Sequence, residues 1–145
     1  MSVRGLAPAD ADQAVRLYHH LVGDGAVAGP EDFARVIAHP GTSILGAFVA
    51  EDLVAMVTLH ILPNMTQGGR PYALVENVVT HAEHRGTGQG RHVMQAAIEA
   101  AWAADCYKIM LLTGRAAEAR GFYEKLGFDA DEKWGMTIRR APLRT

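Results

Sequence analysis

Hydrophobic and polar positions follow two different periods along this chain, and the two periods alternate. Short segments rich in valine, isoleucine and leucine, several with a repeat of two, are typical of strands in a sheet. Between them, apolar residues recur every three or four positions, which is typical of helices with one buried face. The expected strands cover residues 2–6, 42–50, 53–62, 72–80, 107–113 and 132–140. The expected helices cover residues 8–22, 30–37, 92–104 and 116–126.

The order of these elements decides the fold class. Two helices follow the first strand, three strands then come in succession, and strand and helix alternate only toward the end. Successive strands joined by short turns pair antiparallel, whereas the crossover from Thr80 through the long helix to Tyr107 requires a parallel pair. The sequence therefore predicts an α+β fold with a mixed, mostly antiparallel sheet flanked by about four helices.

The composition is that of an ordinary globular protein, with 145 residues, 49% hydrophobic and 21% charged. This length predicts a single domain over residues 1–145. A net charge of −2 provides no basic excess for nucleic acid, and no long apolar run indicates a membrane partner. Cys106 is the only cysteine, which excludes an intramolecular disulfide and suits a reducing compartment. Because the N-terminus also lacks a signal pattern, we expect a soluble, cytoplasmic protein.

The segment His84–Arg91 places three glycines between the strand at residues 72–80 and the helix at residues 92–104. Glycine lets backbone N–H groups approach a ligand closely, and a helix N-terminus attracts anions. Basic side chains crowd the same place, where acidic residues are normally favoured; they are His84, Arg85, Arg91 and His92. The segment therefore predicts an anion site that suits a diphosphate, with a ligand-free glycine-rich connector as the alternative.

The spacing of the glycines excludes two common phosphate loops. A dinucleotide fingerprint needs Gly-x-Gly-x-x-Gly, but Gly86 and Gly88 are followed by a glycine only two residues later. A P-loop ends in Gly-Lys-Ser/Thr, and this segment has no lysine, which disfavours a nucleotide-binding switch. The pattern that remains is Arg-x-x-Gly-x-Gly, formed by Arg85, Gly88 and Gly90. It resembles the coenzyme A pyrophosphate loop of the GNAT family of N-acetyltransferases.

A second motif strengthens this resemblance. Residues 121–128, Gly-Phe-Tyr-Glu-Lys-Leu-Gly-Phe, are similar to the family's C-terminal Tyr-x-x-x-Gly-Phe signature. Gly127 is also an ordinary helix stop, after which Phe128 is expected to pack back on Phe122 or Tyr123. The resemblance implies the acyl-coenzyme A N-acyltransferase (GNAT) fold, in which the sheet splays between its fourth and fifth strands and holds acetyl-coenzyme A. Dimers are frequent in the family, so the resemblance also suggests a homodimer.

The resemblance implies specific contacts to acetyl-coenzyme A as the co-substrate. The backbone of Val78 and Val79 matches the strand that hydrogen-bonds the pantetheine arm. Many relatives also hold the coenzyme with an asparagine seven residues before the signature tyrosine, and this chain has Ala116 there. The implied pyrophosphate contacts are Arg85, Gly86, Thr87, Gly88, Gln89, Gly90 and Arg91, and Tyr123 is implied to reach the coenzyme sulfur.

Two residues are the candidates for catalysis. By resemblance, Tyr123 is the general acid that protonates the leaving thiolate, since a phenol with an ordinary pKa of about 10 keeps its proton until then. Glu76 lies within an otherwise apolar strand, on a face predicted to carry Leu74, Val78 and Thr80. It is either a general base working through a water or a structural carboxylate paired with an arginine or a backbone amide.

The expected function is transfer of an acetyl group from acetyl-coenzyme A directly to a primary amine of a small molecule. A non-catalytic domain that senses acyl-coenzyme A is the alternative. Direct transfer leaves Cys106 as a small buried hydrophobic group rather than a nucleophile. No metal is predicted, since His81 and His84 have no third partner in the sequence pattern.

The residues define the amine acceptor less closely than they define the coenzyme site. Three segments, residues 76–80, 105–109 and 122–125, resemble glucosamine-6-phosphate N-acetyltransferases, but the connection between the last two is longer here. A sugar phosphate is therefore one candidate acceptor. Arg70 and Arg115 either hold an acidic group of the acceptor or are ordinary surface arginines.

Overall fold

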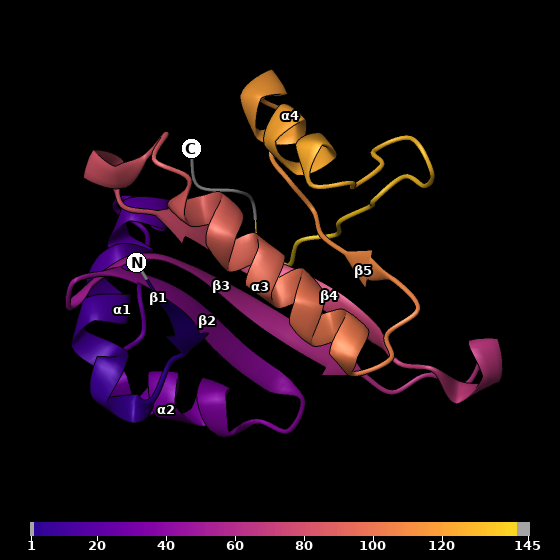
Figure 1. Ribbon diagram of the computed structural model, residues 1–145, viewed down its shortest axis with the longest axis horizontal. Coiled ribbons are helices and arrows are strands. Elements are labelled where there is room, and N and C mark those ends of the chain that lie inside the picture. Colours follow the sequence, from indigo (N-terminus) through magenta and orange to yellow (C-terminus); the bar gives the residue numbers. More distant parts are fainter. Residues whose placement is uncertain (1, 142–145) are drawn as a thin grey trace. The chain divides into compact units, whose positions relative to one another are not determined.

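The computed structural model describes residues 2–141, and the chain forms two compact units, Met1–Leu111 and Leu112–Thr145. The first unit contains a five-stranded sheet with the strands in chain order (Figure 1). The first four strands run antiparallel and β5 pairs parallel with β4, so the predicted α+β class and mixed sheet are confirmed. The strands are β1 (Ser2–Gly5), β2 (Thr42–Val49), β3 (Asp52–Leu62), β4 (Tyr72–Thr80) and β5 (Ile109–Met110).

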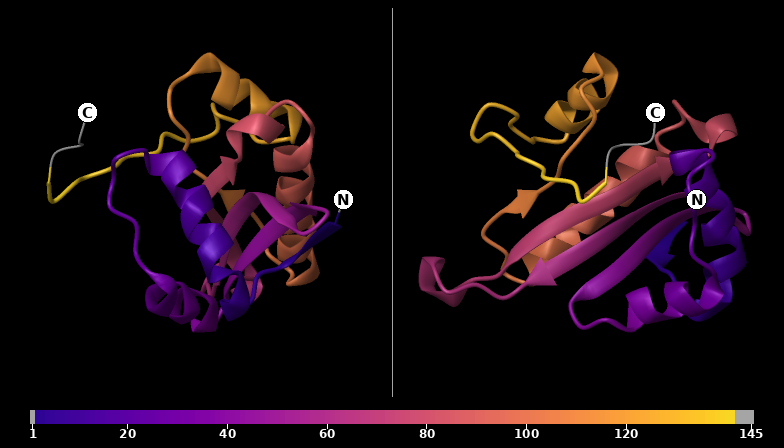
Figure 2. Two further views of the ribbon diagram at one scale, coloured as in Figure 1. Left: turned by 90° about the vertical axis from the view of Figure 1, so that its left-hand side faces the viewer. Right: turned by 180° about the vertical axis from the view of Figure 1, so that it is seen from behind.

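Four α-helices are present in the described chain, as predicted. They are α1 (Ala11–Val22), α2 (Pro30–Ala38), α3 (Gln89–Ala103) and α4 (Ala117–Lys125), the last of them in the second unit. None of the described helices is both long and apolar enough to cross a membrane. The connection from β3 to β4, with a 3-10 turn at Gln67–Gly69, projects from the end of the sheet (Figure 2).

Helices cover both faces of the sheet in the first unit (Figure 2). α1 and α2 bury Leu17 and Phe33 against one face, where Ile44 and Met56 belong to the same core. α3 packs on the other face and contacts β2, β3 and β4. Its buried residues are Gln89, Val93, Met94, Ala97 and Ala101. Trp102, near the C-terminal end of α3, is 53% exposed.

β4 contains a bulge that the sequence analysis missed. Glu76 pairs with Thr58 and Val79 pairs with Met56, so two residues of β4 oppose one residue of β3. The first of the two, Asn77, has a φ of +52°, a value that asparagine tolerates better than most residues. Residues directly opposite each other share a face of the sheet, so Glu76 lies on the face of α1 and α2 with Thr58.

Because of the bulge, the residues predicted to share one face of β4 do not all do so. The alternation expected from Leu74 through Glu76 to Thr80 is interrupted, because Thr80 pairs with Ala55 while Glu76 pairs with Thr58. Ala55 and Thr58 point to opposite faces of β3, and Thr80 and Glu76 therefore do so too. The prediction that Glu76, Val78 and Thr80 share one face is wrong, since an inserted residue reverses the alternation beyond it.

The parallel pair between β4 and β5 is short. Ala73 pairs with Ile109 and Leu74 with Met110, and the paired register extends no further. The strand predicted at residues 107–113 is therefore wrong in its length, because β4 offers its partner only two paired positions. Beyond Leu74 this edge of β4 has no strand neighbour within the described residues, and its backbone groups are available to a ligand. The sheet thus opens between its fourth and fifth strands, as the resemblance implied.

The second unit is built around α4 and its C-terminal turn. Gly127 has a φ of +103°, and the Phe128 backbone N–H donates to the Tyr123 carbonyl oxygen at 3.1 Å. The Phe128 ring lies edge-on to the Tyr123 ring, with 6.0 Å between ring centroids. The predicted helix stop and the return of Phe128 onto the helix are confirmed. Ala116, the N-cap of α4, provides no side-chain cap.

The strand predicted at residues 132–140 is wrong. The segment is irregular and exposed, although Trp134, Met136 and Ile138 alternate as in a strand. These three side chains are 93%, 91% and 99% exposed. A strand needs a neighbour that satisfies its backbone N–H and carbonyl groups, and within residues 2–141 no strand pairs with this segment.

An ion pair holds the start of the chain beside α1. Arg4 donates hydrogen bonds of 2.8 and 3.0 Å to the Asp10 carboxylate, and the Ala7 backbone N–H donates to it at 2.7 Å. The hydrogen bond from Arg4 is the main reason that the pKa of Asp10 is lowered from its ordinary 3.8. A lowered carboxylate pKa stabilises the fold above the unfolded-state value, and this contribution is lost as the pH falls through the folded-state value.

We expect Asp10→Asn to lower the melting temperature by a few degrees at neutral pH, because the charge-assisted hydrogen bonds are lost. The difference from the wild type should shrink as the pH falls below 3.8, where the unfolded-state carboxyl becomes protonated. Thermal unfolding followed by circular dichroism at several pH values measures both effects. Asp24→Asn, at an exposed position on the same unit, is the control, and a difference that does not depend on pH would contradict the assignment.

Candidate active site

The glycine-rich segment forms the passage from β4 to α3. A 3-10 turn at Ala82–His84 follows β4, and Gly88 is the N-cap of α3 with a φ of +86°. Gly86 also has a positive φ, +78°, and residues with a Cβ rarely adopt these values. The path of the backbone therefore requires glycine at both positions. In the first turn of α3, the N–H groups of Gly90 and Arg91 have no acceptor within the helix.

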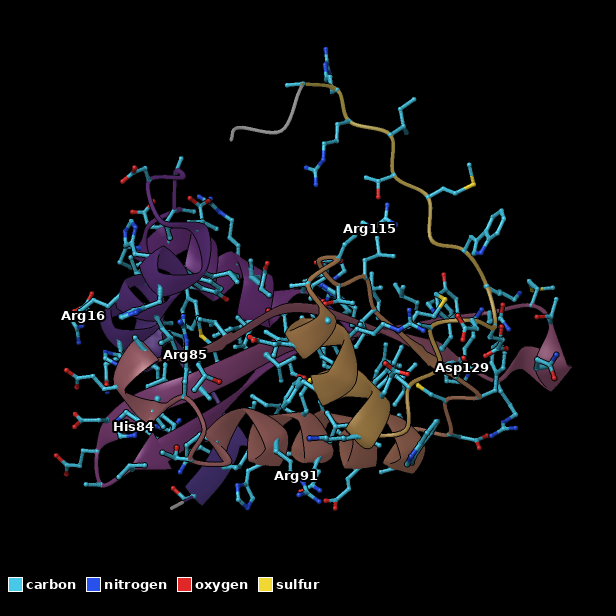
Figure 3. All side chains as sticks on the ribbon, turned by 90° about the horizontal axis from the view of Figure 1, so that it is seen from above. Arg16, His84, Arg85, Arg91, Arg115 and Asp129 are labelled. Atoms are coloured by element: carbon cyan, nitrogen blue, oxygen red, sulfur yellow. The ribbon has the colours of Figure 1, made fainter. Side chains whose placement is uncertain are left out.

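Positive charge gathers at this helix end, and no ion pair within the described residues neutralises it. The first turn of α3 contains no acidic residue, and Arg85 and Arg91 form no ion pair with any residue from 2 to 141. Figure 3 shows His84 and Arg85 at the N-terminal end of α3 and Arg91 on the helix itself. His92 donates from Nδ1 to the Gly88 carbonyl oxygen at 2.6 Å and so holds the turn. A diphosphate would neutralise this charge and the helix dipole together.

The residues around the glycine-rich segment fit a diphosphate. An added Cβ at Gly86 would meet no atom within 4 Å, so the space beside the loop is open. The Gln89 side chain is 9% exposed, and its Oε1 has no hydrogen-bond partner among the described residues. A buried polar atom without a partner is costly, which favours a ligand or water beside the first turn of α3.

The histidine rings before the loop contact one another in tilted and edge-on arrangements. The His81 ring lies 4.3 Å from the His20 ring of α1 and 5.9 Å from the His84 ring, between centroids. His81 Nδ1 accepts a hydrogen bond from the Glu83 backbone N–H at 3.1 Å. This bond caps the 3-10 turn, while the ring contact between His81 and His20 joins the start of the loop to α1.

The Glu76 side chain is exposed, and its carboxylate forms no hydrogen bond or ion pair with the other described residues. The structural alternative, in which its carboxylate pairs with an arginine or a backbone amide, therefore has no support within residues 2–141. The apolar enclosure expected for it is also absent, because Glu76 itself is exposed although Val75 before it is buried. Val79 is buried beyond the bulge and Val78 is half-buried.

A cavity of about 430 Å³ lies on the α1 and α2 side of the sheet. Its lining comes from both helices, from their connection, and from β2, β3 and the bulge of β4. Tyr18, Thr58, His60 and Asn77 supply polar groups to the cavity. Burial raises the pKa of Tyr18, and the Thr58 side chain opposes this effect. The cavity thus reaches Asn77, the direct neighbour of Glu76.

A hydrogen-bonded chain leads from the cavity to the surface, and the sequence analysis missed it. His60 Nδ1 lies 2.9 Å from the Thr42 Oγ1, and the same oxygen lies 3.1 Å from His39 Nδ1. His60 is half-buried at the cavity wall and His39 is exposed. The three residues come from α2's C-terminal end, β2 and β3, so no local sequence pattern joins them.

The remaining candidate residues belong to different units of the chain. Tyr123 lies in the second unit, where burial raises the pKa of its hydroxyl and its ring centroid lies 5.0 Å from that of Phe122. Cys106 is 1% exposed and burial raises the pKa of its thiol, and the prediction that it is buried is confirmed. Arg70 forms a 3.3 Å ion pair with Asp105, so its guanidinium is already engaged. Arg115 lies in the second unit.

The profile of the acetyltransferase (GNAT) family matches residues 10–128, which span both units. A putative acetyltransferase from Agrobacterium tumefaciens has a solved structure that is 42% identical, with a TM-score of 0.91 over 97% of this chain and 100% of that one. A glucosamine 6-phosphate N-acetyltransferase from Trypanosoma brucei brucei is 29% identical over 137 residues, 92% of each chain. The structure of glucosamine-6-phosphate N-acetyltransferase from Arabidopsis thaliana is 20% identical, with a TM-score of 0.82 over 97% of this chain and 98% of that one.

Proposed function

The chain belongs to the acetyltransferase (GNAT) family, and from this premise we propose that it transfers the acetyl group of acetyl-coenzyme A to a primary amine of a small molecule. One observation carries the proposal. The unpaired edge of β4 lies between the glycine-rich loop at its C-terminal end and the cavity beside its bulge. A coenzyme arm along this edge and an amine in the cavity would meet at residues 76–79.

We assign the diphosphate of the coenzyme to the backbone from Gly86 to Arg91, with Arg85 at the entrance to the loop. The arm of the coenzyme is assigned to the backbone of Val78 and Val79, where the edge of β4 offers N–H and carbonyl groups to an extended ligand. The orphaned Oε1 of Gln89 and the open space at Gly86 support this assignment.

The reaction needs two proton transfers. The amine nitrogen attacks the thioester carbonyl carbon, a C–N bond forms and the C–S bond breaks. One proton leaves the nitrogen, and the departing thiolate takes up another. Glu76 is the proposed acceptor of the first proton, through a water, because it is exposed, unpaired and adjacent to the cavity-lining Asn77. Tyr123 is the proposed donor of the second.

We expect Glu76→Gln to lower kcat/KM about 100-fold, since the amide has the shape of the carboxylate but cannot accept a proton. Coenzyme A affinity should stay unchanged, because the substitution leaves the backbone edge of β4 intact. Thiol release from acetyl-coenzyme A with a panel of amines measures turnover, and calorimetry measures coenzyme binding. The matched control is Glu99→Gln, at an exposed position on α3.

Two results would contradict these assignments. Unchanged turnover in Glu76→Gln would remove Glu76 from the proton transfer. A wild-type chain that binds coenzyme A but releases thiol with no amine would refute the proposed activity, and it would favour the sensor that the sequence analysis left as the alternative.

A further inference from the structure

The lining of the cavity defines the class of acceptor more narrowly than the family does. Most of its lining side chains are aliphatic or aromatic. Several large hydrophobic side chains of the first unit are exposed, and three of them line this cavity. They are Leu21, Val22 and Val36, at 39%, 45% and 40% exposure. Exposed apolar side chains that gather in a concave site mark a surface for an apolar ligand.

The charges of the cavity do not suit a phosphate. None of the described residues that line it is a lysine or an arginine, and its one acidic side chain, Asp32, pairs with Arg35 on the same helix. A phosphate dianion placed here would lose its hydration against aliphatic groups and approach a carboxylate. Burial of an unpaired charge is strongly unfavourable. A sugar phosphate is therefore a poor occupant of this cavity.

Three polar side chains of the cavity lie on its sheet side, whereas Tyr18 and Asp32 come from the helices. Thr58 and His60 come from β3 and Asn77 from the bulge of β4, whereas Val22 and Val36 come from the helices. An acceptor whose amine points to the sheet would place its nitrogen near Glu76 and its body against α1 and α2.

We propose that the acceptor is a primary amine on an uncharged apolar body, such as an alkyl or aryl amine, bound in this cavity. This inference rests on the proposed acetyl transfer. The nitrogen attacks the acetyl carbonyl carbon, the coenzyme thiolate leaves with a proton, and the proton lost by the nitrogen passes to the base. The apolar body is held by the walls from α1 and α2, and the phosphorylated amines named in the relatives' descriptions are disfavoured.

Thiol release with three probes tests the class of acceptor. The probes are 2-phenylethylamine, glucosamine and glucosamine 6-phosphate, each with acetyl-coenzyme A and the full chain. We expect kcat/KM for 2-phenylethylamine to exceed that for glucosamine 6-phosphate by at least about 10-fold, a modest threshold for the burial of an apolar ring against the burial of a phosphate. A preference for glucosamine 6-phosphate would overturn the inference while leaving the proposed acetyl transfer intact.

Leu21→Arg places a cation on the cavity wall, near the C-terminus of α1 where a positive charge is favoured. It should lower kcat/KM for 2-phenylethylamine about 10-fold and raise it for glucosamine 6-phosphate. Met65→Arg adds the same charge at a 94% exposed position on the connection between β3 and β4, and it should change neither value. Equal effects of the two variants, or no effect of Leu21→Arg, would overturn the inference.

A binding measurement separates the acceptor class from the chemistry. Titration of 2-phenylethylamine into the coenzyme A-bound chain should shift the backbone amide resonances of Ile44 and Thr58 in NMR spectra, and Leu21→Arg should reduce these shifts. If these shifts occur without any thiol release, the inferred acceptor site stands and the proposed activity fails. If the shifts appear only at residues outside the cavity, the inference fails whether or not thiol is released.

Discussion

Gly88→Ala is expected to weaken coenzyme A binding at least about 10-fold, because the left-handed backbone of this N-cap costs a residue with a Cβ about 1–2 kcal/mol. The added methyl group itself has room, since the nearest atoms, of the His92 ring, lie at 3.6 Å. The chain relieves the strain by rotating the peptide groups at Gly88, and the amides of the first turn of α3 then point away from the diphosphate. Charge-assisted hydrogen bonds depend steeply on direction.

A matched substitution separates this effect from general strain. Gly68 has a φ of +67°, and an added Cβ there meets no atom within 4 Å. Gly68→Ala should therefore reduce the free energy of unfolding by a similar amount and leave coenzyme A affinity at the wild-type value. Calorimetric titration with coenzyme A and thermal unfolding of both variants provide the two measurements. If the variants bind coenzyme A equally well, the loop does not hold the diphosphate.

The elements that local periodicity specifies were predicted from the sequence. α2 and β4 appear within a residue of their expected bounds, because Pro30 at the first helical position and the apolar run of β4 determine them locally. The glycine-rich loop was found for the same reason, since all of its residues are consecutive. Positive φ at Gly86 and Gly88 explains why glycine occupies these positions.

Elements that depend on a distant partner were not predicted correctly. The strand expected at residues 132–140 alternates apolar and polar residues, but no strand within residues 2–141 pairs with it. The bulge at Asn77 was missed because it is defined by the register of β4 against β3. An asparagine inside an apolar strand was the one available signal, since asparagine tolerates a positive φ. The consequence is local, because the bulge places Val78 and Thr80 on the face opposite to Glu76.

The candidate acceptor site could not be predicted from sequence patterns, because its residues come from separate elements. His60, Thr42 and His39 are joined by hydrogen bonds only after α2, β2 and β3 have packed. The cavity wall likewise combines residues from two helices and three strands. The proposed coenzyme contacts lie in one contiguous loop and can be predicted from the sequence, whereas the proposed acceptor site appears only in the folded structure.

Tyr123→Phe is expected to lower kcat by about 100-fold or more, the ordinary value of a well-placed general acid. The substitution removes one hydroxyl and keeps the ring between Phe122 and Phe128, where edge-on contacts at 5.0 and 6.0 Å between centroids hold it. Coenzyme A affinity should change little, since the hydroxyl is proposed to act on the sulfur only as the thiolate leaves. Thiol release under saturating substrates measures kcat, and calorimetry measures binding.

The pH dependence provides an independent check on Tyr123. Burial raises the pKa of its hydroxyl above the ordinary 10.0, and a general acid is active only while protonated, so the basic limb of kcat should begin above pH 10.0. The same shift means that the hydroxyl stabilises the fold fully below pH 10.0 and loses this contribution as the pH rises through the folded-state value. Tyr107→Phe, at a half-buried tyrosine outside the proposed machinery, is the matched control. If Tyr123→Phe keeps wild-type kcat, or if the basic limb falls well below pH 10.0 in the wild type and persists in the variant, another group protonates the thiolate.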